Sequence, residues 1–278
     1  MLWSRCVLRH LFLLPSTLPQ LTSCLAEQFF TPNYSIPQRL AMMHALASAA
    51  HELAGLAPLT DVDAHAMRVA DQAVQRAPEK GTSQIRPWDV PFAPAKTIAP
   101  KANYLSVATS AFVLPLVNRF FLYLGPYTRG GYRHAGSNAA LRPEALSAAL
   151  LTLCILCSAA RNALGFYANV MPDVITLAVL CCGRAQENDA QVHGASLSLV
   201  LVMLDAAWER DRGAQLVRTQ ASLLLNVRDT AQGILDSDVP AGDASPRARA
   251  VRAAAGTLVR VSEMERDARD ALLGPGTL

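Results

Sequence analysis

The chain has 278 residues, of which 51% are hydrophobic and 17% are charged, and its formal net charge is +3. This length allows one large or two small domains with a substantial core, and the apolar content excludes disorder throughout. The small net charge does not by itself argue for nucleic-acid binding. Alanine and leucine dominate the composition and both favour helices.

The N-terminal stretch MLWSRCVLRHLFLLPSTLPQ carries Arg5 and Arg9, and no acidic residue occurs before Glu27. That balance is typical of a mitochondrial transit peptide, whereas the apolar run LFLL is too short for a secretory signal. The alternative is that these residues belong to the first helix of a longer chain whose start has been cut. We favour the alternative because of the family resemblance that later segments show.

Residues 37–56 are predicted to form an amphipathic helix. Pro37 suits its first turn, and Gly55 is the residue expected at its C-terminal end. Apolar residues recur there every three to four positions, which predicts one buried face. The residues left available to solvent are Arg39, His44 and Glu52. A second amphipathic helix is predicted from Thr60-Asp61 to about Ala77.

Residues 78–103 contain five prolines, a density that forbids a long helix and predicts an extended connector. Further helices are predicted over residues 104–124, 143–164, 166–184, 190–211, 213–236 and 246–272. Pro172 and Asp173 are expected to divide the third of these. No stretch shows the sustained two-residue alternation of a strand.

Short connections among the last five predicted helices make neighbouring helices antiparallel. Stacked antiparallel pairs bury their apolar faces against one another, so the sequence predicts an all-α fold, an α-solenoid of degenerate HEAT-like helical pairs. The predicted organisation is N-terminal helices over residues 1–77, the proline-rich connector over 78–103 and a C-terminal solenoid domain over 104–278. The charges of mixed sign in the last helix predict a solvent-exposed helix that caps the stack.

Two uncharged runs bear on membrane insertion. Ala145–Ala160 has 16 residues, just short of the roughly 18 expected of a membrane span, and Val174–Cys182 is shorter still. A helix that is apolar on all sides is also what the inner layer of a large helical protein requires. We interpret both runs as core helices and expect no membrane partner.

Six cysteines are present, and Cys154 and Cys157 form a C-x-x-C motif inside the apolar run LLTLCILCSAA. A zinc or redox pair needs a turn, polar neighbours and a second ligand pair, which the adjacent Cys181 and Cys182 do not supply from one helix. Buried free thiols in a reducing compartment are the better interpretation.

Searches for catalytic patterns give no support for an enzyme. His51-Glu52 begins like a zinc-protease helix, but Gly55 stands where the second histidine would be. The glycines of GPYTRGGYRHAG lack the lysine and hydroxyl residue of a phosphate loop, and no G-x-S-x-G elbow occurs. We therefore expect no catalytic residue, no cofactor and no metal.

A basic loop over residues 126–142 follows the long apolar stretch that begins at Tyr104. Its arginines and tyrosines can contact an acidic protein partner, or bind phosphates and stack on bases. The remaining alternative is a solvated loop that closes against its own scaffold. The candidate partner-binding residues are Arg119, Tyr127, Arg129, Tyr132, Arg133, His134 and Arg142.

Three segments in order resemble the conserved C-terminal region of the telomere-length-regulation (Tel/Clk) protein family, fungal type. They are QRLAMMHALASAAHELAGL, then YLSVATSAFVLPLVNRFFLYL with the following GGYRHAGSNAALRPEAL, then SLSLVLVMLDAAWERDRGAQLVRTQASLLLNVRDTAQGIL. The resemblance covers roughly residues 30–265. Its most specific parts are the ELAGL block, the PL-x-x-RF helix and the R-x-x-YR-x-AG loop.

The resemblance implies a non-catalytic scaffold subunit of a three-protein co-chaperone complex. Such a complex, together with the ninety-kDa heat-shock chaperone and its adaptors, matures and stabilises phosphatidylinositol-kinase-related kinases. The implied partners are the other subunits, that chaperone and those kinases, in the cytoplasm and nucleus, with roles in telomere length and DNA-damage signalling. The alternative function is binding of telomeric DNA or other nucleic acid through the 126–142 loop.

The chain departs from this family in two respects. Members carry a large additional N-terminal solenoid, and they carry an acidic, serine-containing linker that is phosphorylated to recruit the chaperone adaptor. Neither is visible in these 278 residues. We therefore expect a truncated gene model or a different start, and no adaptor recruitment by this chain alone.

Overall fold

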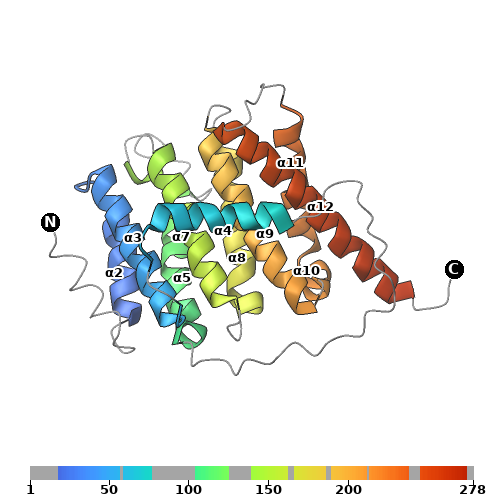
Figure 1. Cartoon of the computed structure of the whole chain (residues 1–278), viewed down its shortest axis with the longest axis horizontal. Helices are drawn as coiled ribbons and strands as arrows, with labels where there is room; N and C mark the ends of the chain where they lie inside the picture. The colour runs from blue at the N-terminus through green and yellow to red at the C-terminus, as the bar shows by residue number, and fades with distance from the viewer. Residues whose placement is uncertain are drawn as a thin grey trace.

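The computed structural model describes residues 18–56, 59–76, 104–124, 139–161, 166–185, 189–211, 213–237 and 245–273, which form helices and turns and no strand (Figure 1). The all-α class is therefore confirmed for these residues. The helices are α2 (Leu18–Phe30), α3 (Ile36–Leu53), α4 (Val62–Arg76), α5 (Tyr104–Leu124), α7 (Pro143–Ala160), α8 (Met171–Arg184), α9 (Ala190–Asp211), α10 (Ala214–Thr219), α11 (Ala221–Leu235) and α12 (Pro246–Leu273).

Most of these helices pack as pairs that follow one another in chain order. α2 contacts α3, α5 contacts α7, α8 contacts α9, and α11 contacts α12. Contacts between successive pairs join α2, α5, α8 and α11 into one layer, and α3, α7, α9 and α12 into a second layer. In Figure 1 the pairs run from the blue helices on one side to the red helices on the other.

The second layer consists of parallel helices, and we refer to α3, α7, α9 and α12 as the parallel layer. Gly194 of α9 lies against Ala250 of α12. Three turns further along each helix, Asp205 of α9 bonds to Arg260 of α12, so the two helices run in the same direction. On α3 and α7, Ala47 packs with Ile155. The C-terminal halves of α7 and α9 meet through the ion pair of Arg161 with Glu209.

Helix α4 does not belong to either layer. It runs across the outer side of the parallel layer, roughly at right angles to its helices, and contacts α3, α7, α9 and α12 (Figure 1). The buried residues among its described side chains are the alanines Ala66, Ala70 and Ala73, which are spaced so that they share one face. The α4 helix therefore lies on the layer by a stripe of small side chains, with the partly buried Val62 and Val69 beside it.

The ends of α3 show why this segment is helical. The side chain of Gln38 accepts the backbone N–H of Ser35, the residue before the helix, at 2.9 Å. At the other end Gly55 has a φ of 73°, and the N–H groups of Gly55 and Leu56 bond back to Glu52 and His51. This is a Schellman motif, which favours glycine, so the end predicted at Gly55 is confirmed.

Arg39 was expected to face solvent, and that expectation is wrong. Its side chain is fully buried, and its guanidinium donates to the carbonyls of Tyr34 at 3.1 Å and Thr31 at 2.7 Å. It also lies 5.8 Å from the centre of the Phe29 ring. The arginine thus satisfies carbonyl groups just beyond the end of α2. Burial lowers the pKa of its guanidinium from the usual value.

Other boundaries differ in detail from those predicted. The division expected near Pro172 is present, because a π-helical turn over Phe166–Val170 precedes α8. The helix expected over residues 213–236 is two helices, α10 and α11, which break at Gln220. Helix α2 was not predicted, and Phe29 and Phe30 anchor it against Phe120 of α5 with ring centres 5.8 and 4.8 Å apart.

Helix α12 was expected to be a solvent-exposed cap, but one side of it is deeply buried against α9. Arg247 and Arg260 are both buried, together with an apolar stripe of Ala250, Ala253, Ala254, Val261 and Met264. The exposed charges are confined to the opposite side of the helix. The predicted division into segments 1–77, 78–103 and 104–278 stays a prediction, since the connector lies outside the described residues.

Alanine substitutions at two glycine positions should change the stability of the fold in opposite directions. Gly213 has a φ of 74°, and a Cβ there would clash with the buried Met264 side chain, so Gly213→Ala should destabilise the fold by about 2 kcal/mol. Gly233, inside α11, has nothing within 4 Å of such a Cβ, so Gly233→Ala should stabilise by about 0.5–1 kcal/mol. Urea denaturation of both variants measures the difference, and equal effects would contradict the described turn before α10.

Candidate functional site

The residues predicted to bind partners are only partly within the described structure. Arg119 lies on α5 and forms an ion pair with Glu27 of α2, and Arg142 is exposed directly before α7. No hydrogen bond or ion pair joins these two arginines within the described part of the chain. The other candidates, Tyr127, Arg129, Tyr132, Arg133 and His134, lie outside the described residues.

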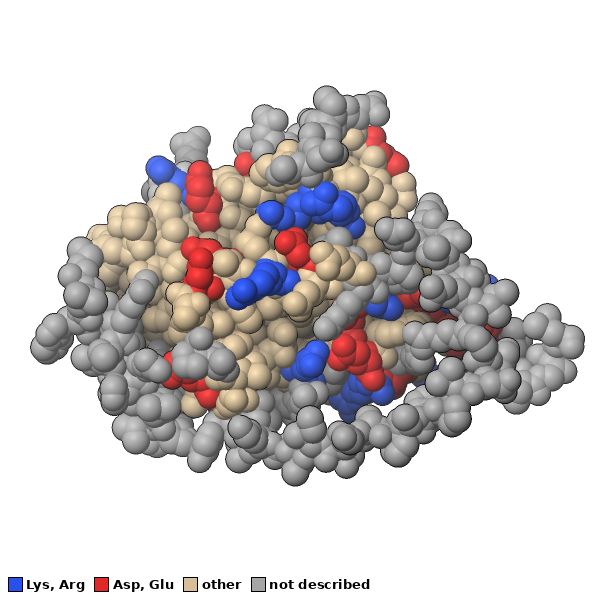
Figure 2. Space-filling model, in the orientation of Figure 1, with Lys and Arg blue, Asp and Glu red and all other residues tan. Residues whose placement is uncertain are grey.

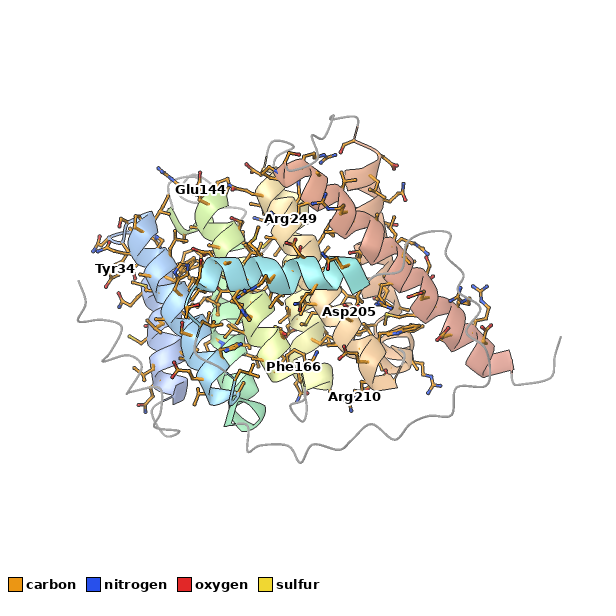
Figure 3. All side chains as sticks on the ribbon, viewed as in Figure 1. Tyr34, Glu144, Phe166, Asp205, Arg210 and Arg249 are labelled. Atoms are coloured by element: carbon orange, nitrogen blue, oxygen red, sulfur yellow. The ribbon has the colours of Figure 1, made fainter. Side chains whose placement is uncertain are left out.

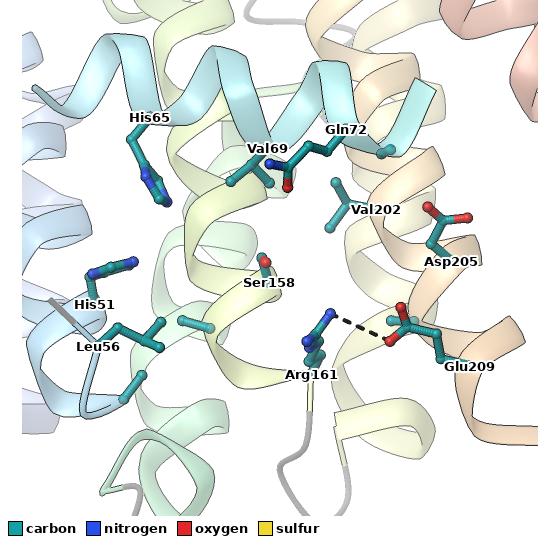
Figure 4. Close-up of a pocket in the computed structure, with 14 residues that line it drawn as sticks. His51, Leu56, His65, Val69, Gln72, Ser158, Arg161, Val202, Asp205 and Glu209 are labelled. Atoms are coloured by element: carbon teal, nitrogen blue, oxygen red, sulfur yellow. Dashed lines mark hydrogen bonds and ion pairs between the residues drawn. The ribbon is translucent and has the colours of Figure 1, made fainter. Parts of the chain in front are cut away.

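A cavity of about 340 Å³ lies between α4 and the C-terminal halves of α3, α7 and α9. Figure 4 shows α4 above it, with His65, Val69 and Gln72 pointing toward the parallel layer. The polar residues that line it are His51, His65, Gln72, Ser158, Arg161, Asp205 and Glu209. Alanines, valines and Leu56 complete the wall, so the cavity is amphipathic.

One end of the cavity is formed by two histidines from different helices. The rings of His51 on α3 and His65 on α4 meet edge to face, with centres 4.8 Å apart. Arg68 Nη2 also donates to Nδ1 of His65 at 3.5 Å in the neutral tautomer that accepts there. Burial, then the nearby His51 and Arg68, lower the pKa of His65 below 6.5. His65 is therefore mostly neutral at pH 7.

The opposite end contains Asp205, whose partner Arg260 comes from α12. Arg260 donates through Nη2 and Nε to Oδ1 of Asp205 at 2.7 and 2.9 Å, and both side chains are less than a tenth exposed. The same guanidinium bonds to Glu263 at 2.9 Å and lies 5.0 Å from the centre of the Trp208 ring. Asp205 is thus held in place by α12 while one side of it borders the cavity.

The lower rim is an ion pair of Arg161 with Glu209, at 3.4 Å, and both side chains are nearly half exposed (Figure 4). Such an exposed pair contributes little to stability, on the order of 0–1 kcal/mol. It can therefore open at small cost when another group approaches. The cavity therefore combines an end formed by two histidine rings, a buried carboxylate that is already paired, and a rim that can exchange partners.

Metal and thiol chemistry find little support in the described part of the chain. No group of three or more histidine, cysteine or acidic side chains is placed there to hold a metal ion. Cys154, Cys157, Cys181 and Cys182 are free and buried, as the sequence predicted. Burial raises their pKa values, to about 12 for Cys181 and Cys182, so these thiols stay protonated at neutral pH.

Two described helices, α7 and α9, are long and apolar enough to cross a membrane by length and composition. In the fold, 72% and 89% of their most apolar stretches are buried against other helices. The core helix of a soluble protein passes the same test, so this is weak evidence of a membrane span.

Surface charge is mixed on the face that α4 crosses. Figure 2 shows basic and acidic side chains interspersed there, without a large area of one sign among the coloured residues. Arg249 on α12 illustrates the pattern, since its Nε lies 3.8 Å from a carboxylate oxygen of Asp71 on α4. In Figure 3 Arg249 and Asp205 are labelled on opposite sides of α4. Among the described residues, this face shows no continuous basic stripe of the kind that nucleic-acid interfaces have.

The cavity was not predicted from the sequence, because its residues come from four helices separated by up to about 160 positions. Only Asp205 gave a local signal, as a single carboxylate inside the apolar run LSLVLVMLDAAW. His51 was noted as part of an incomplete zinc motif, and its partner His65 has no sequence relation to it.

Comparison with protein-family models finds no match, and no curated protein or solved structure matches the chain. The resemblance to the Tel/Clk family therefore depends on the three sequence segments alone.

Stability should fall as the pH is lowered below neutral. His65, and His193 on α9 whose pKa is lowered mainly by burial, bind fewer protons folded than unfolded. Their contribution is fully present above about pH 6.5 and is lost as the pH falls toward their lowered folded values. Urea titrations between pH 7.5 and 5 should show a smaller loss of unfolding free energy in His65→Gln plus His193→Gln than in the unchanged chain. Identical slopes would contradict the proposed neutral burial of both rings.

Removing the carboxylate of Asp205 should be strongly destabilising. Asp205→Asn leaves the buried Arg260 cation without its main partner, so we expect a loss of about 3–5 kcal/mol. The double variant Asp205→Leu with Arg260→Met should recover most of that loss, because no buried charge then remains. Glu209→Gln, in the exposed pair one turn away, serves as the control and should change stability by less than about 0.5–1 kcal/mol. A similar loss in both single variants would argue against a buried ion pair.

Proposed function

We propose that this chain is a non-catalytic helical scaffold that binds other proteins. The observation that carries the proposal is the stack of helical pairs, whose parallel layer offers one continuous surface built from helices far apart in the sequence. The charged groups that border its cavity are paired with one another or with α12. The thiols of Cys181 and Cys182 are buried and protonated at neutral pH, which makes them poor nucleophiles.

We further propose that the pairs are degenerate HEAT-like repeats of an α-solenoid. Each pair contacts its neighbours in both layers, as expected of a stack of repeats. Two pairs also share a hydrogen-bonding pattern, in which an arginine near the start of the second helix donates to carbonyls at the end of the first. Arg39 from the start of α3 bonds to carbonyls after α2, and Arg247 from the start of α12 donates to carbonyls of Ile234 and Ser237 at the end of α11. Such recurrence supports a repeated unit.

The specific role proposed is that of the family that the sequence resembles. The chain would act as a scaffold subunit of a three-protein co-chaperone complex, with the ninety-kDa heat-shock chaperone and its adaptors, in the maturation of phosphatidylinositol-kinase-related kinases. It would work in the cytoplasm and nucleus and influence telomere length and DNA-damage signalling. Within the described residues, the resembling segments correspond to α3, to α5 and the start of α7, and to the α9–α11 region.

Co-purification tests this role directly. Tagged full-length chain should recover the two other subunits and the kinases, and its depletion should lower kinase abundance. Recovery of the chain alone, with unchanged kinase levels, would overturn the proposal.

A pair of double variants locates the contact. Arg129→Ala with Arg133→Ala should reduce recovery if the basic loop binds the partner, whereas Arg266→Ala with Arg269→Ala, at the exposed side of α12, should not. Binding of the chain to DNA that weakens steeply with salt and with the first double variant would instead favour the nucleic-acid alternative.

A further inference from the structure

The contact between α4 and the parallel layer is made largely by small side chains. Between α2 and α5, by contrast, the large side chains of Phe29, Phe30 and Phe120 fill the interface. Under α4 the buried side chains are Ala66, Ala70 and Ala73, and the 340 Å³ cavity adjoins them. Part of the interface beside α4 is therefore not filled by side chains.

Two polar contacts fix the position of α4 across the layer. Near its start, Asp63 lies 2.9 Å from Nε2 of His44 on α3. Two turns later, Asp71 faces Arg249 of α12 at 3.8 Å, and Arg249 also donates to the sulfur of Met67 at 3.7 Å. The layer thus presents His44 at the α3 side and Arg249 at the α12 side. Helix α4 presents Asp63 to the first and Asp71 to the second.

Removing α4 would leave an apolar groove across the parallel layer. Ala47 of α3 and Ile155 of α7 pack against Ala66, with Leu151 beside them. Ala159 of α7 and Val202 and Ala206 of α9 line the cavity under the second half of α4. In helix-in-groove recognition, an amphipathic helix lays its apolar face into an apolar groove of this kind.

We propose that this groove is a helix-binding site of the scaffold, and that α4 occupies it as an internal stand-in for a partner helix. The partner is an amphipathic helix with small residues at the spacing of Ala66, Ala70 and Ala73 and acidic residues at the positions of Asp63 and Asp71. The occupant is specified by α4 itself, whose alanine stripe fits the groove and whose carboxylates match His44 and Arg249. This inference rests on the proposed scaffold function and names the kind of partner that it accepts.

Because α4 and a partner helix would bind the same groove, they would compete for it. A tethered helix is present at a high effective concentration, so a free helix gains access only when α4 is released. The cavity beside α4 is space in which the helix makes no contacts, and this lowers the free-energy cost of releasing it. A partner helix that binds the groove better than α4 would therefore shift the chain toward the released state.

Substitutions on the two sides of α4 test the proposal. Ala70 is fully buried and Ala64 is exposed on the same helix, so Ala70→Leu should push α4 off the layer while Ala64→Leu should not. In hydrogen-exchange measurements on the full chain, Ala70→Leu should raise exchange in residues 62–76 and leave α2, α5 and α8 protected. Loss of protection in all helices would show that α4 is an obligatory part of the fold and would overturn the proposal.

Binding in trans provides the second measurement. A fluorescent peptide of residues 59–76 should bind the Ala70→Leu chain at least roughly tenfold more tightly than the unchanged or Ala64→Leu chain. Adding Arg249→Ala to Ala70→Leu should weaken that binding, whereas adding Arg269→Ala, at an exposed position of the same helix, should not. Absence of peptide binding to a folded Ala70→Leu chain, or equal binding to all variants, would overturn the proposal. Co-purification of partners is scored separately, so failure of the scaffold role and failure of the groove can be told apart.

Discussion

The structure depends on the need to cover α9 on every side. Each residue from Val192 to Ala207 is buried, so no side of this helix over more than four turns faces water. A helix that is apolar all round requires neighbours all round. In this fold α7 and α12 flank it within the parallel layer, α8 covers it from the other layer, and α4 covers its outer side. A two-layer stack alone would leave that outer side open, which explains why a crossing helix is present.

The polar groups inside this core act on register more than on stability. A buried ion pair such as that of Asp205 with Arg260 gains little over well-packed apolar residues, since both charges lose their hydration. It does, however, fix how far α12 slides along α9, because a shift by one turn would separate the charges. At the other end Gly194 packs against the backbone of α12 at Ala250. The ion pair therefore specifies an alignment that non-directional apolar packing would leave open.

Helix positions could be predicted from the sequence, while the path of the helices in space could not. Local signals act over one or two turns, so Gly55 and Pro143 marked ends that the structure contains. Arg39 was misplaced because periodicity assigns a polar residue to the outer face, whereas carbonyls at the end of α2 form a partner for it only in the folded chain. Helix α2 was missed for a related reason, since the aromatic contacts with α5 that anchor it form only in the folded chain.

The cavity shows the limit of sequence reasoning most clearly, and also why it lies where it does. His51, Arg161 and Glu209 meet because the helices of the parallel layer end on the same side, and no spacing along the chain records that fact. A straight helix laid across several parallel helices touches their crests and bridges the hollows between them. The alanines of α4 allow it to approach the crests closely, but they are too short to fill the hollows. The same small residues that let α4 cover α9 therefore leave a cavity beside it, next to the groove that we propose as a helix-binding site.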